Sequence, residues 1–174
     1  AQNVSAQLPD AECWFLARDG QVFVTPREVL AAHEKAFTTE FTPGGAATWP
    51  SLDTALDAPA AKGRTFFLAL HGGDGENGVT QQKFESRGLA FTGSSAMASA
   101  QAFDKARTKE LAQAKGARVA QERRLDTTKE AELRRTLAEL LSNAPRWVLK
   151  PQADGSSHGL VHLRAPDEID AAVK

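Results

Sequence analysis

The chain has 174 residues, 41% of them hydrophobic and 25% charged, and its formal net charge is −1. This near-neutral charge gives no electrostatic reason to expect a nucleic acid or an anionic membrane as a partner. No apolar run approaches the roughly 20 residues that a membrane-spanning helix needs, and no signal peptide is visible. The single cysteine, Cys13, cannot form an intramolecular disulfide, which fits a cytoplasmic location.

The two ends of the chain lack the usual terminal signals. The chain opens at Ala1 without an initiator methionine and closes at Lys174 inside a predicted helix that begins at Pro166. Pro166 suits a first helical position, and neither Gly nor Asn follows to end that helix. We therefore expect a fragment of a longer protein.

The first elements predicted along the chain are a hairpin and a short helix. Asp19-Gly20 joins two apolar, β-prone runs at residues 13–18 and 21–25, which is a strong hairpin pattern. A short helix is expected over residues 26–37, and a loop or bulged strand over residues 42–50. Residues 55–62 are rich in alanine and remain ambiguous.

A βαβ unit follows. Residues 66–70 form a continuous apolar run, which predicts a strand buried on both faces, as in a parallel sheet. A glycine-rich turn at residues 71–78, a helix at 79–87 and a short strand at 89–92 complete the unit. The order of these elements indicates an α/β fold.

The second half of the sequence predicts two helices and two strands. A helical region capped by Ser94 or Ser95 should run to Lys115 and end at Gly116. Thr127 or Thr128 should cap the next helix, whose apolar stripe consists of Leu133, Leu137, Leu140 and Leu141. Strands are expected at residues 147–150 and 159–163. We place a domain boundary near residues 93–98.

The glycine-rich turn is a candidate binding site. It lies at the C-terminal end of a predicted buried strand, where open α/β sheets bind ligands. Its glycines let backbone N–H groups approach an anion closely, and His71 is the first side chain beyond the strand. A tight turn without binding function explains the same residues equally well.

Gly73, Gly75 and Gly78 also match the G-x-G-x-x-G pattern of dinucleotide-binding enzymes. That alternative requires an acidic residue about 20 positions further on to hold the ribose. This chain has residues 91–95 there, without an acid, and the next acid is Asp104 inside a predicted helix. The missing acid argues against a dinucleotide site.

A second candidate segment spans residues 150–159. Lys150 ends a predicted strand, and a loop with two serines and several backbone amides follows, which together can bind phosphate. An exposed hairpin tip with a surface lysine is the simpler interpretation of this segment alone. Lys105, after Asp104, is a third candidate, although most helical lysines are solvated.

Taken together, these segments resemble the D-alanine–D-alanine ligase family, a member of the ATP-grasp class. The resemblance is strong from about Phe66 to Val161, and the Asp19-Gly20 hairpin fits the family's early strands. The matching segments are residues 67–72, Gly75-Glu76-Asn77-Gly78 with Gln81, residues 91–94, residues 98–100, Asp104-Lys105 with Lys109, and residues 148–151 with 155–159. The resemblance implies an N-terminal Rossmann-like (pre-ATP-grasp) parallel-sheet domain that binds substrate, residues 1–95, and the start of an α+β ATP-grasp domain, residues 96–174.

The resemblance implies ATP-dependent joining of two D-alanines through an acyl phosphate, for peptidoglycan synthesis. The first carboxylate would attack the γ-phosphate of ATP, and the second amine would then displace phosphate. Lys105 and Lys150, on separate subdomains, would hold the phosphates beneath a serine-bearing flap. The implied phosphate-binding residues are Lys105, Lys150, Gly155, Ser156 and Ser157; the implied substrate-binding residues are His71, Gly72 and Ser156, with His71 and Ser156 catalytic.

Parts of the family pattern are absent. The family's first glutamate, its adenine pocket and its Mg²⁺ ligands have no counterpart, so we expect no metal ligand in this chain and an inactive isolated fragment. His158 stands where a small apolar residue is usual, and Phe91 where tyrosine is frequent. Alternatives are a ligase that uses D-lactate or D-serine as second substrate, or a non-catalytic binding homologue. A homodimer is expected from the family.

Overall fold

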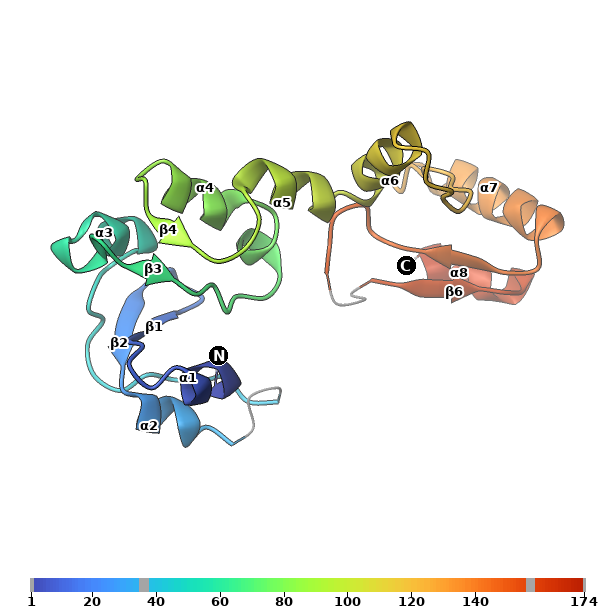
Figure 1. Ribbon diagram of the computed structural model, residues 1–174. Helices are drawn as coiled ribbons and strands as arrows, with labels where there is room; N and C mark the ends of the chain where they lie inside the picture. The colour runs from blue at the N-terminus through green and yellow to red at the C-terminus, as the bar shows by residue number, and fades with distance from the viewer. Residues whose placement is uncertain (1, 35–37, 156–158, 174) are drawn as a thin grey trace. The chain divides into compact units, whose positions relative to one another are not determined.

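The computed structural model (Figure 1) describes residues 2–34, 38–155 and 159–173. The chain divides into two compact units, residues 1–99 and residues 100–174. The domain boundary predicted from the sequence lies between residues 95 and 96, and the assignment of a function to each domain stays a prediction. In the residues described, no helix is long and apolar enough to cross a membrane.

The first unit contains the predicted hairpin. Strands β1 (Cys13–Leu16) and β2 (Val22–Thr25) are antiparallel, with Leu16 opposite Val22. The turn closes with a 2.9 Å hydrogen bond from the Ala17 amide to the Gln21 carbonyl, and Gly20 takes a φ of +86° that favours glycine. The hairpin prediction is therefore confirmed.

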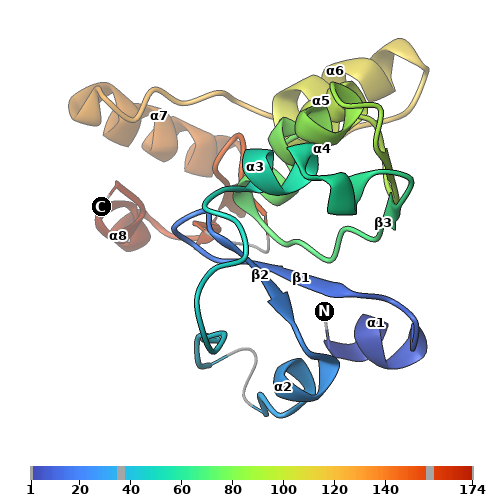
Figure 2. The same ribbon diagram turned by 90° about the vertical axis from the view of Figure 1, so that its left-hand side faces the viewer.

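Short helices complete this unit. They are α1 (Gln2–Gln7), α2 (Arg27–Ala31), α3 (Leu52–Asp57) and the 3₁₀ turn η1 (Pro59–Ala61). The helix predicted over residues 26–37 ends at Ala31, and residues 35–37 lie outside the described part. The ambiguous alanine-rich stretch belongs to α3 and η1, and Ser51 caps α3 by accepting a hydrogen bond from the Thr54 amide. Figure 2 shows β1 and β2 between α3 and α4 (Val79–Glu85) on one side and α1 and α2 on the other.

The parallel βαβ unit is present. Strands β3 (Thr65–Phe66) and β4 (Ala90–Phe91) pair in parallel, and α4 connects them. The prediction that residues 66–70 form a strand buried on both faces is wrong, because pairing stops at Phe66 and Phe67 is 53% exposed. The physical reason is that β3 has one paired neighbour within the described chain, so the sheet does not cover the residues beyond Phe66.

A chain of aromatic contacts forms the core of this unit. The Trp14 ring on β1 lies 5.3 Å from that of Phe66, which in turn lies 5.0 Å from Phe84 on α4. Trp49 and Phe91 extend the chain at its two ends. These contacts fix the hairpin against the βαβ unit and so support the loop that follows β3.

The predicted single helix from residue 94 to 115 is two helices. Helix α5 (Ala96–Phe103) spans the division between the units, and α6 (Lys105–Ala114) follows it after Asp104. Asp104 has a φ of −80° and a ψ of 108°, and its carboxylate accepts hydrogen bonds from the Ala106 and Arg107 amides. The side chain thus caps a new helix in place of continuing the old one. Gly116 follows α6 with a φ of +83°, as predicted.

The second unit packs helices against a hairpin. Its elements after α6 are α7 (Glu130–Asn143), β5 (Trp147–Leu149), β6 (Val161–Leu163), the 3₁₀ turn η3 (Pro166–Glu168) and α8 (Ile169–Val173). Strands β5 and β6 are antiparallel (Figure 1). Leu133 and Leu137 of α7 pack with Leu163 and Ile169, and Leu140 and Leu141 flank them, which confirms the predicted apolar stripe.

The threonine cap predicted for α7 is wrong. Lys129 occupies the N-cap position and makes no side-chain capping bond. The Thr128 hydroxyl and amide both donate to the Asp126 carboxylate, so a local turn uses the groups that would have capped the helix. Glu130 and Glu132 remain in the first turn, as predicted, where they complement the positive end of the helix dipole.

Candidate functional site

The glycine-rich loop of the first unit follows β3. Gly72 and Gly73 have φ values of +74° and +45°, and η2 (Gly73–Gly75) forms one tight turn before Gly78, at +94°, leads into α4. His71 is exposed beside Gly72 at the start of this turn. Glycines recur here because Gly72, Gly73 and Gly78 all have a positive φ, which glycine adopts without strain.

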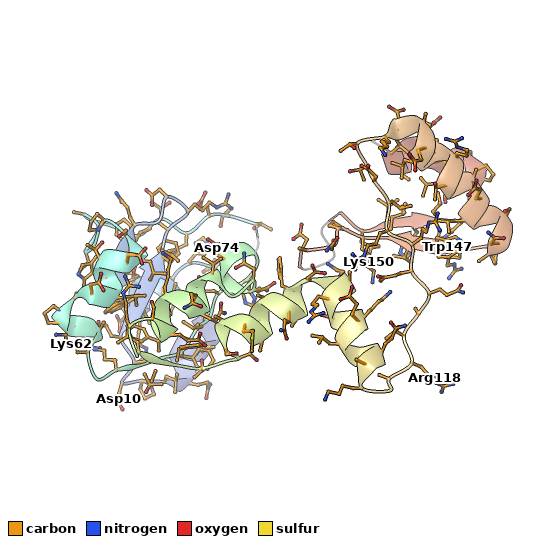
Figure 3. All side chains as sticks on the ribbon, turned by 90° about the horizontal axis from the view of Figure 1, so that it is seen from above. Asp10, Lys62, Asp74, Arg118, Trp147 and Lys150 are labelled. Carbon is orange, nitrogen blue, oxygen red and sulfur yellow. The ribbon has the colours of Figure 1, made fainter. Side chains whose placement is uncertain are left out.

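Close packing and short-range hydrogen bonds hold this loop. A Cβ atom added at Gly75 would lie 2.7 Å from the Cβ atom of Leu70, so only glycine fits. The Gln81 side chain, 7% exposed, donates a 2.8 Å hydrogen bond to the Gly75 carbonyl. Asn77 accepts from the Val79 amide and donates to Asp74, which is labelled in Figure 3. The loop is therefore fixed from within and presents His71 at its edge.

The residue that follows β4 (Ala90–Phe91) is Thr92. The Thr92 hydroxyl accepts a hydrogen bond from the Leu68 amide, and the Thr92 amide donates to the Phe66 carbonyl. A hydroxyl committed to the backbone stands where the dinucleotide alternative requires an acid. The structure therefore adds nothing in favour of that alternative.

In the second unit, the loop between β5 and β6 has a closed base. Gly159 has a φ of +65°, and a Cβ atom there would lie 2.7 Å from Cγ of Pro151. Lys150 is exposed immediately before this point, and Figure 3 shows it at the end of the hairpin nearest α6. Ser156 and Ser157, predicted phosphate contacts, and His158 lie outside the described residues.

The start of α6 lies against this loop. Asp104 and Ala153 form an isolated antiparallel bridge, and the Lys105 amide donates a 3.0 Å hydrogen bond to the Gln152 carbonyl. The Lys105 ammonium donates a 2.7 Å hydrogen bond to the Asp154 carbonyl. The Asp154 carboxylate accepts from the Gly155 amide at 2.7 Å. The structure thus brings Lys105 to the loop that begins at Lys150 and contains Gly155.

The arrangement of the two lysines differs from the expectation. They were expected on separate subdomains, but both belong to the unit of residues 100–174. The reason is that the break at Asp104 turns Lys105 into the first residue of a helix that contacts the β5–β6 loop. His71 and Gly72 belong to the other unit. The predicted roles of all these residues in binding stay predictions.

Asp104 is a functional candidate that the sequence analysis underrated. Its Oδ1 atom accepts from the Ala106 and Arg107 amides, and its Oδ2 atom accepts a 2.8 Å hydrogen bond from the Gln152 amide group. The Arg107 amide, followed by the Gln152 side chain, lowers the pKa of the Asp104 carboxyl below its usual value. Aspartate strongly prefers the N-cap position, so the helix start at Asp104 could have been predicted from the sequence. Nothing in the sequence indicates the hydrogen bond between Asp104 and Gln152.

No metal centre is found in the described part of the chain, where no group of three or more His, Cys, Asp or Glu side chains could hold an ion. The described residues therefore do not form a ligand set for Mg²⁺.

Known proteins resemble this chain in sequence over more than half of its length. No protein-family model matches it. It is 36% identical over 122 residues to a D-alanine–D-alanine ligase of Haemophilus ducreyi, covering 70% of this chain and 39% of that protein. It is 40% identical over 108 residues to a ligase of the same name from Haemophilus influenzae, covering 62% of this chain and 36% of that protein. The chain spans little more than a third of the length of these relatives.

Solved structures share its fold. The D-alanine–D-alanine ligase of Helicobacter pylori matches 99% of this chain and 53% of its own, with a TM-score of 0.72 and 21% identity. The VanG D-Ala:D-Ser ligase of Enterococcus faecalis matches 99% of this chain and 53% of its own, with a TM-score of 0.68 and 23% identity. These matches confirm the predicted α/β fold class. In sequence, the chain is therefore similar to proteins named D-alanine–D-alanine ligase, and it shares a fold with solved structures of that name.

Proposed function

We propose that the protein containing this chain joins two D-alanines in an ATP-dependent, ADP-forming reaction. The observation that carries the proposal is the position of Lys105, whose ammonium reaches the loop that starts at Lys150. Two cationic side chains at one glycine-containing loop suit a polyphosphate. The sequence similarity to ligases of this name supports the same reaction.

The proposed chemistry proceeds in two steps. A carboxylate oxygen of the first D-alanine attacks the γ-phosphorus, and the bond between the γ-phosphorus and the oxygen that bridges it to the β-phosphate breaks. ADP leaves, and the first D-alanine becomes an acyl phosphate. The amine of the second D-alanine attacks the acyl carbon, phosphate leaves, and the amine loses a proton. Positive charge around the transferred phosphoryl group is the main catalytic requirement. Mg²⁺ would supply further positive charge, from ligands that the described residues do not provide.

Roles are proposed for the site residues. Lys105, Lys150 and Gly155 bind the ATP phosphates together with Ser156 and Ser157. His71 and Gly72 contact the first D-alanine, to which Ser156 also contributes, with His71 and Ser156 acting in catalysis. The exposed position of His71 beside the rigid glycine-rich turn suits contact with a small substrate.

An experiment that follows the transfer of the isotope ¹⁸O tests the reaction. Protein produced from the complete gene is incubated with ATP, Mg²⁺ and D-alanine labelled with ¹⁸O in its carboxylate. The acyl-phosphate route requires one labelled oxygen in each released phosphate, which mass spectrometry detects. L-alanine serves as the control substrate. Release of unlabelled phosphate alongside dipeptide would contradict the acyl phosphate, and absence of ATP-dependent dipeptide would contradict the function.

A second candidate is a ligase with a different second substrate. The observation that favours it is the fold shared with a protein named D-Ala:D-Ser ligase, because the fold accommodates more than one acceptor. Supplying D-alanine together with D-serine or D-lactate in the same assay separates the candidates by the mass of the product. A protein that binds ATP and forms no product with any acceptor would be a non-catalytic homologue.

Lys150→Ala tests the phosphate site. Loss of a charged partner of phosphate costs about 1.5 to 3 kcal/mol, so the KM for ATP should rise about 10- to 150-fold. Lys115→Ala is the matched control, since Lys115 is an exposed lysine of the same unit at the end of α6. An unchanged KM for Lys150→Ala would remove Lys150 from the site.

The wider setting of the reaction follows from the same proposal. The dipeptide product would enter peptidoglycan, and the protein would act in the cytoplasm. Complementation of a bacterial strain deficient in D-alanyl-D-alanine synthesis tests the role in the cell wall, with the Lys150→Ala variant as the negative control.

We also propose that the protein forms a homodimer. Sedimentation equilibrium of the protein from the complete gene measures the oligomeric state directly.

A further inference from the structure

We infer that Asp104 and Gln152 are positioning residues that hold Lys105 and residues 151–155, the first part of the β5–β6 loop, together as one phosphate-binding element. This inference rests on the proposed function, because it concerns how the same ATP site is built. Neither side chain is assigned contact with the nucleotide. Their role is exerted through Lys105 and through the loop residues up to Gly155.

The first step of the argument is that the two carboxylate oxygens of Asp104 serve different structures. The Oδ1 atom accepts hydrogen bonds of 2.9 and 3.0 Å from the Ala106 and Arg107 amides, which begins helix α6. The Oδ2 atom accepts the 2.8 Å hydrogen bond from the side-chain amide of Gln152, on the loop 48 residues away. One side chain therefore connects a helix start to a hairpin loop.

The second step is that Lys105 continues this connection. Its amide donates to the Gln152 carbonyl, and its ammonium donates to the Asp154 carbonyl. Gln152 is thus bound through its backbone and its side chain, and the loop is fixed at two points two residues apart. Because an ammonium has three N–H groups, a bond to Asp154 leaves donors that can reach phosphate oxygens.

The third step is the geometry of the loop itself. Its two ends meet where Gly159 packs against Pro151, and its first part, up to Asp154, is attached to α6. Gly155, a predicted phosphate contact, follows directly on this attached part and donates to the Asp154 carboxylate. Releasing Gln152 from Asp104 should therefore shift residues 152–155 relative to the Lys105 ammonium. A phosphate bound between Lys105 and this part of the loop would then lose alignment.

A simpler interpretation is that Asp104 only caps a helix. Two substitutions separate the roles. Asp104→Ser keeps a good N-cap oxygen but is too short to reach Gln152 as well. Gln152→Ala leaves the cap intact and removes the link. Asp104→Asn can keep both, because asparagine also caps and a rotated Gln152 amide can accept from it.

Steady-state kinetics of the protein from the complete gene provides the first readout. Asp104→Ser and Gln152→Ala should each raise the KM for ATP about 5- to 20-fold, less than the loss of a phosphate-binding lysine, because Lys105 stays and only its alignment with the loop is lost. The KM for D-alanine should stay within about twofold, and the double variant should be no worse than the weaker-binding single variant. Asp104→Asn should recover most of the affinity. Asp126→Ser is the matched control, since its carboxylate accepts from Thr128 in an exposed turn.

Hydrogen exchange without nucleotide provides the second readout. The Lys105 amide, bonded to Gln152, should exchange about 10-fold faster in Asp104→Ser and Gln152→Ala than in the wild type. Faster exchange with an unchanged KM for ATP, or a fall in kcat alone, would overturn the inference while the proposed function stands. Unchanged exchange would also overturn it. A wild-type protein that neither binds ATP nor forms dipeptide would overturn the proposed function, and the inference with it, whatever the exchange rates.

Discussion

Residues 71–78 and residues 151–155, which belong to the two glycine-containing loops of this protein, are held in place by different means. The first is fixed by neighbours in sequence, since Gln81 bonds Gly75 across six residues and Asn77 bonds Asp74 across three. The second is fixed by residues 48 and 49 positions away, through Gln152 with Asp104 and Asp154 with Lys105. A loop held locally keeps its shape wherever its βαβ unit folds, whereas a loop held by distant partners depends on the packing of the whole unit.

The three tryptophans of the chain allow this comparison to be tested in each unit separately. Trp14 and Trp49 pack against each other in the first unit, and Trp147 belongs to β5 in the second. Labelling with 5-fluorotryptophan therefore gives each unit its own ¹⁹F signal during urea unfolding. The unfolding transitions of the two units can then be followed in one sample.

The largest effect is expected for Gly159→Ala at the base of the second loop. Alanine at a φ of +65° is strained by about 1 to 2 kcal/mol, and its Cβ atom would lie 2.7 Å from the rigid Pro151 ring, which adds about 1 to 3 kcal/mol. The Trp147 signal should report an unfolding free energy lower by about 2 to 5 kcal/mol. Gly116→Ala, with a φ of +83° and open space around it, should show the strain alone. Equal losses in the two variants would contradict the close contact at Pro151.

Gly75→Ala tests the close packing of the first loop. Its Cβ atom would lie 2.7 Å from the Cβ atom of Leu70, so the backbone must move, at a cost of about 1 to 3 kcal/mol. The unfolding midpoint reported by the Trp14 and Trp49 signals should move to a lower urea concentration, while the midpoint reported by Trp147 should not. Gly44→Ala is the control in the same unit, because nothing lies within 4 Å of its Cβ position. A destabilisation as large in Gly44→Ala would show that the loss is not specific to the loop.

The two glutamines should differ in their effect on stability. Gln81→Leu removes a buried hydrogen bond to the Gly75 carbonyl and should cost about 1 to 2 kcal/mol in the first unit. Gln152→Ala removes an exposed hydrogen bond and should cost less than about 1 kcal/mol in the second. Its effect should instead appear in the KM for ATP. A larger loss of unfolding free energy in Gln152→Ala than in Gln81→Leu would contradict the expectation that the buried hydrogen bond of Gln81 stabilises its unit more than the exposed one of Gln152.

The smallest expected effect is a dependence on pH below about 4. Hydrogen bonding to Lys83 lowers the pKa of Asp53 in the first unit, and the Arg107 amide lowers that of Asp104 in the second. Because each folded-state pKa lies below the unfolded value of about 3.9, the stabilisation is complete above that pH and is lost as the pH falls through the folded-state pKa. Asp53→Asn should reduce the acid sensitivity of the Trp14 signal, and Asp104→Asn that of the Trp147 signal. If the unfolding free energy of each variant changed with pH in the same way as that of the wild type between pH 7 and 3, the lowered pKa values of Asp53 and Asp104 would be contradicted.

The sequence by itself determined the elements whose causes are local. Asp19-Gly20 fixed the first hairpin, and the order of apolar run, glycine-rich turn and helix gave the parallel βαβ unit. The leucine stripe from Leu133 to Leu141 predicted the core of the second unit. The motifs also led to the ligase family, because their order along the chain is a property of sequence alone.

Tertiary structure decided what depends on neighbours distant in sequence. Pairing with a single strand left Phe67 exposed, although its apolar run indicated burial on both faces. Asp104 appeared to lie within one long helix, and only its bonds to Gln152 and to the start of α6 revealed a break. That break brings Lys105 to the second loop. The physical reason is that helix propensity acts over a few residues, whereas the partner of a carboxylate oxygen can be any donor that folding brings within 3 Å or so.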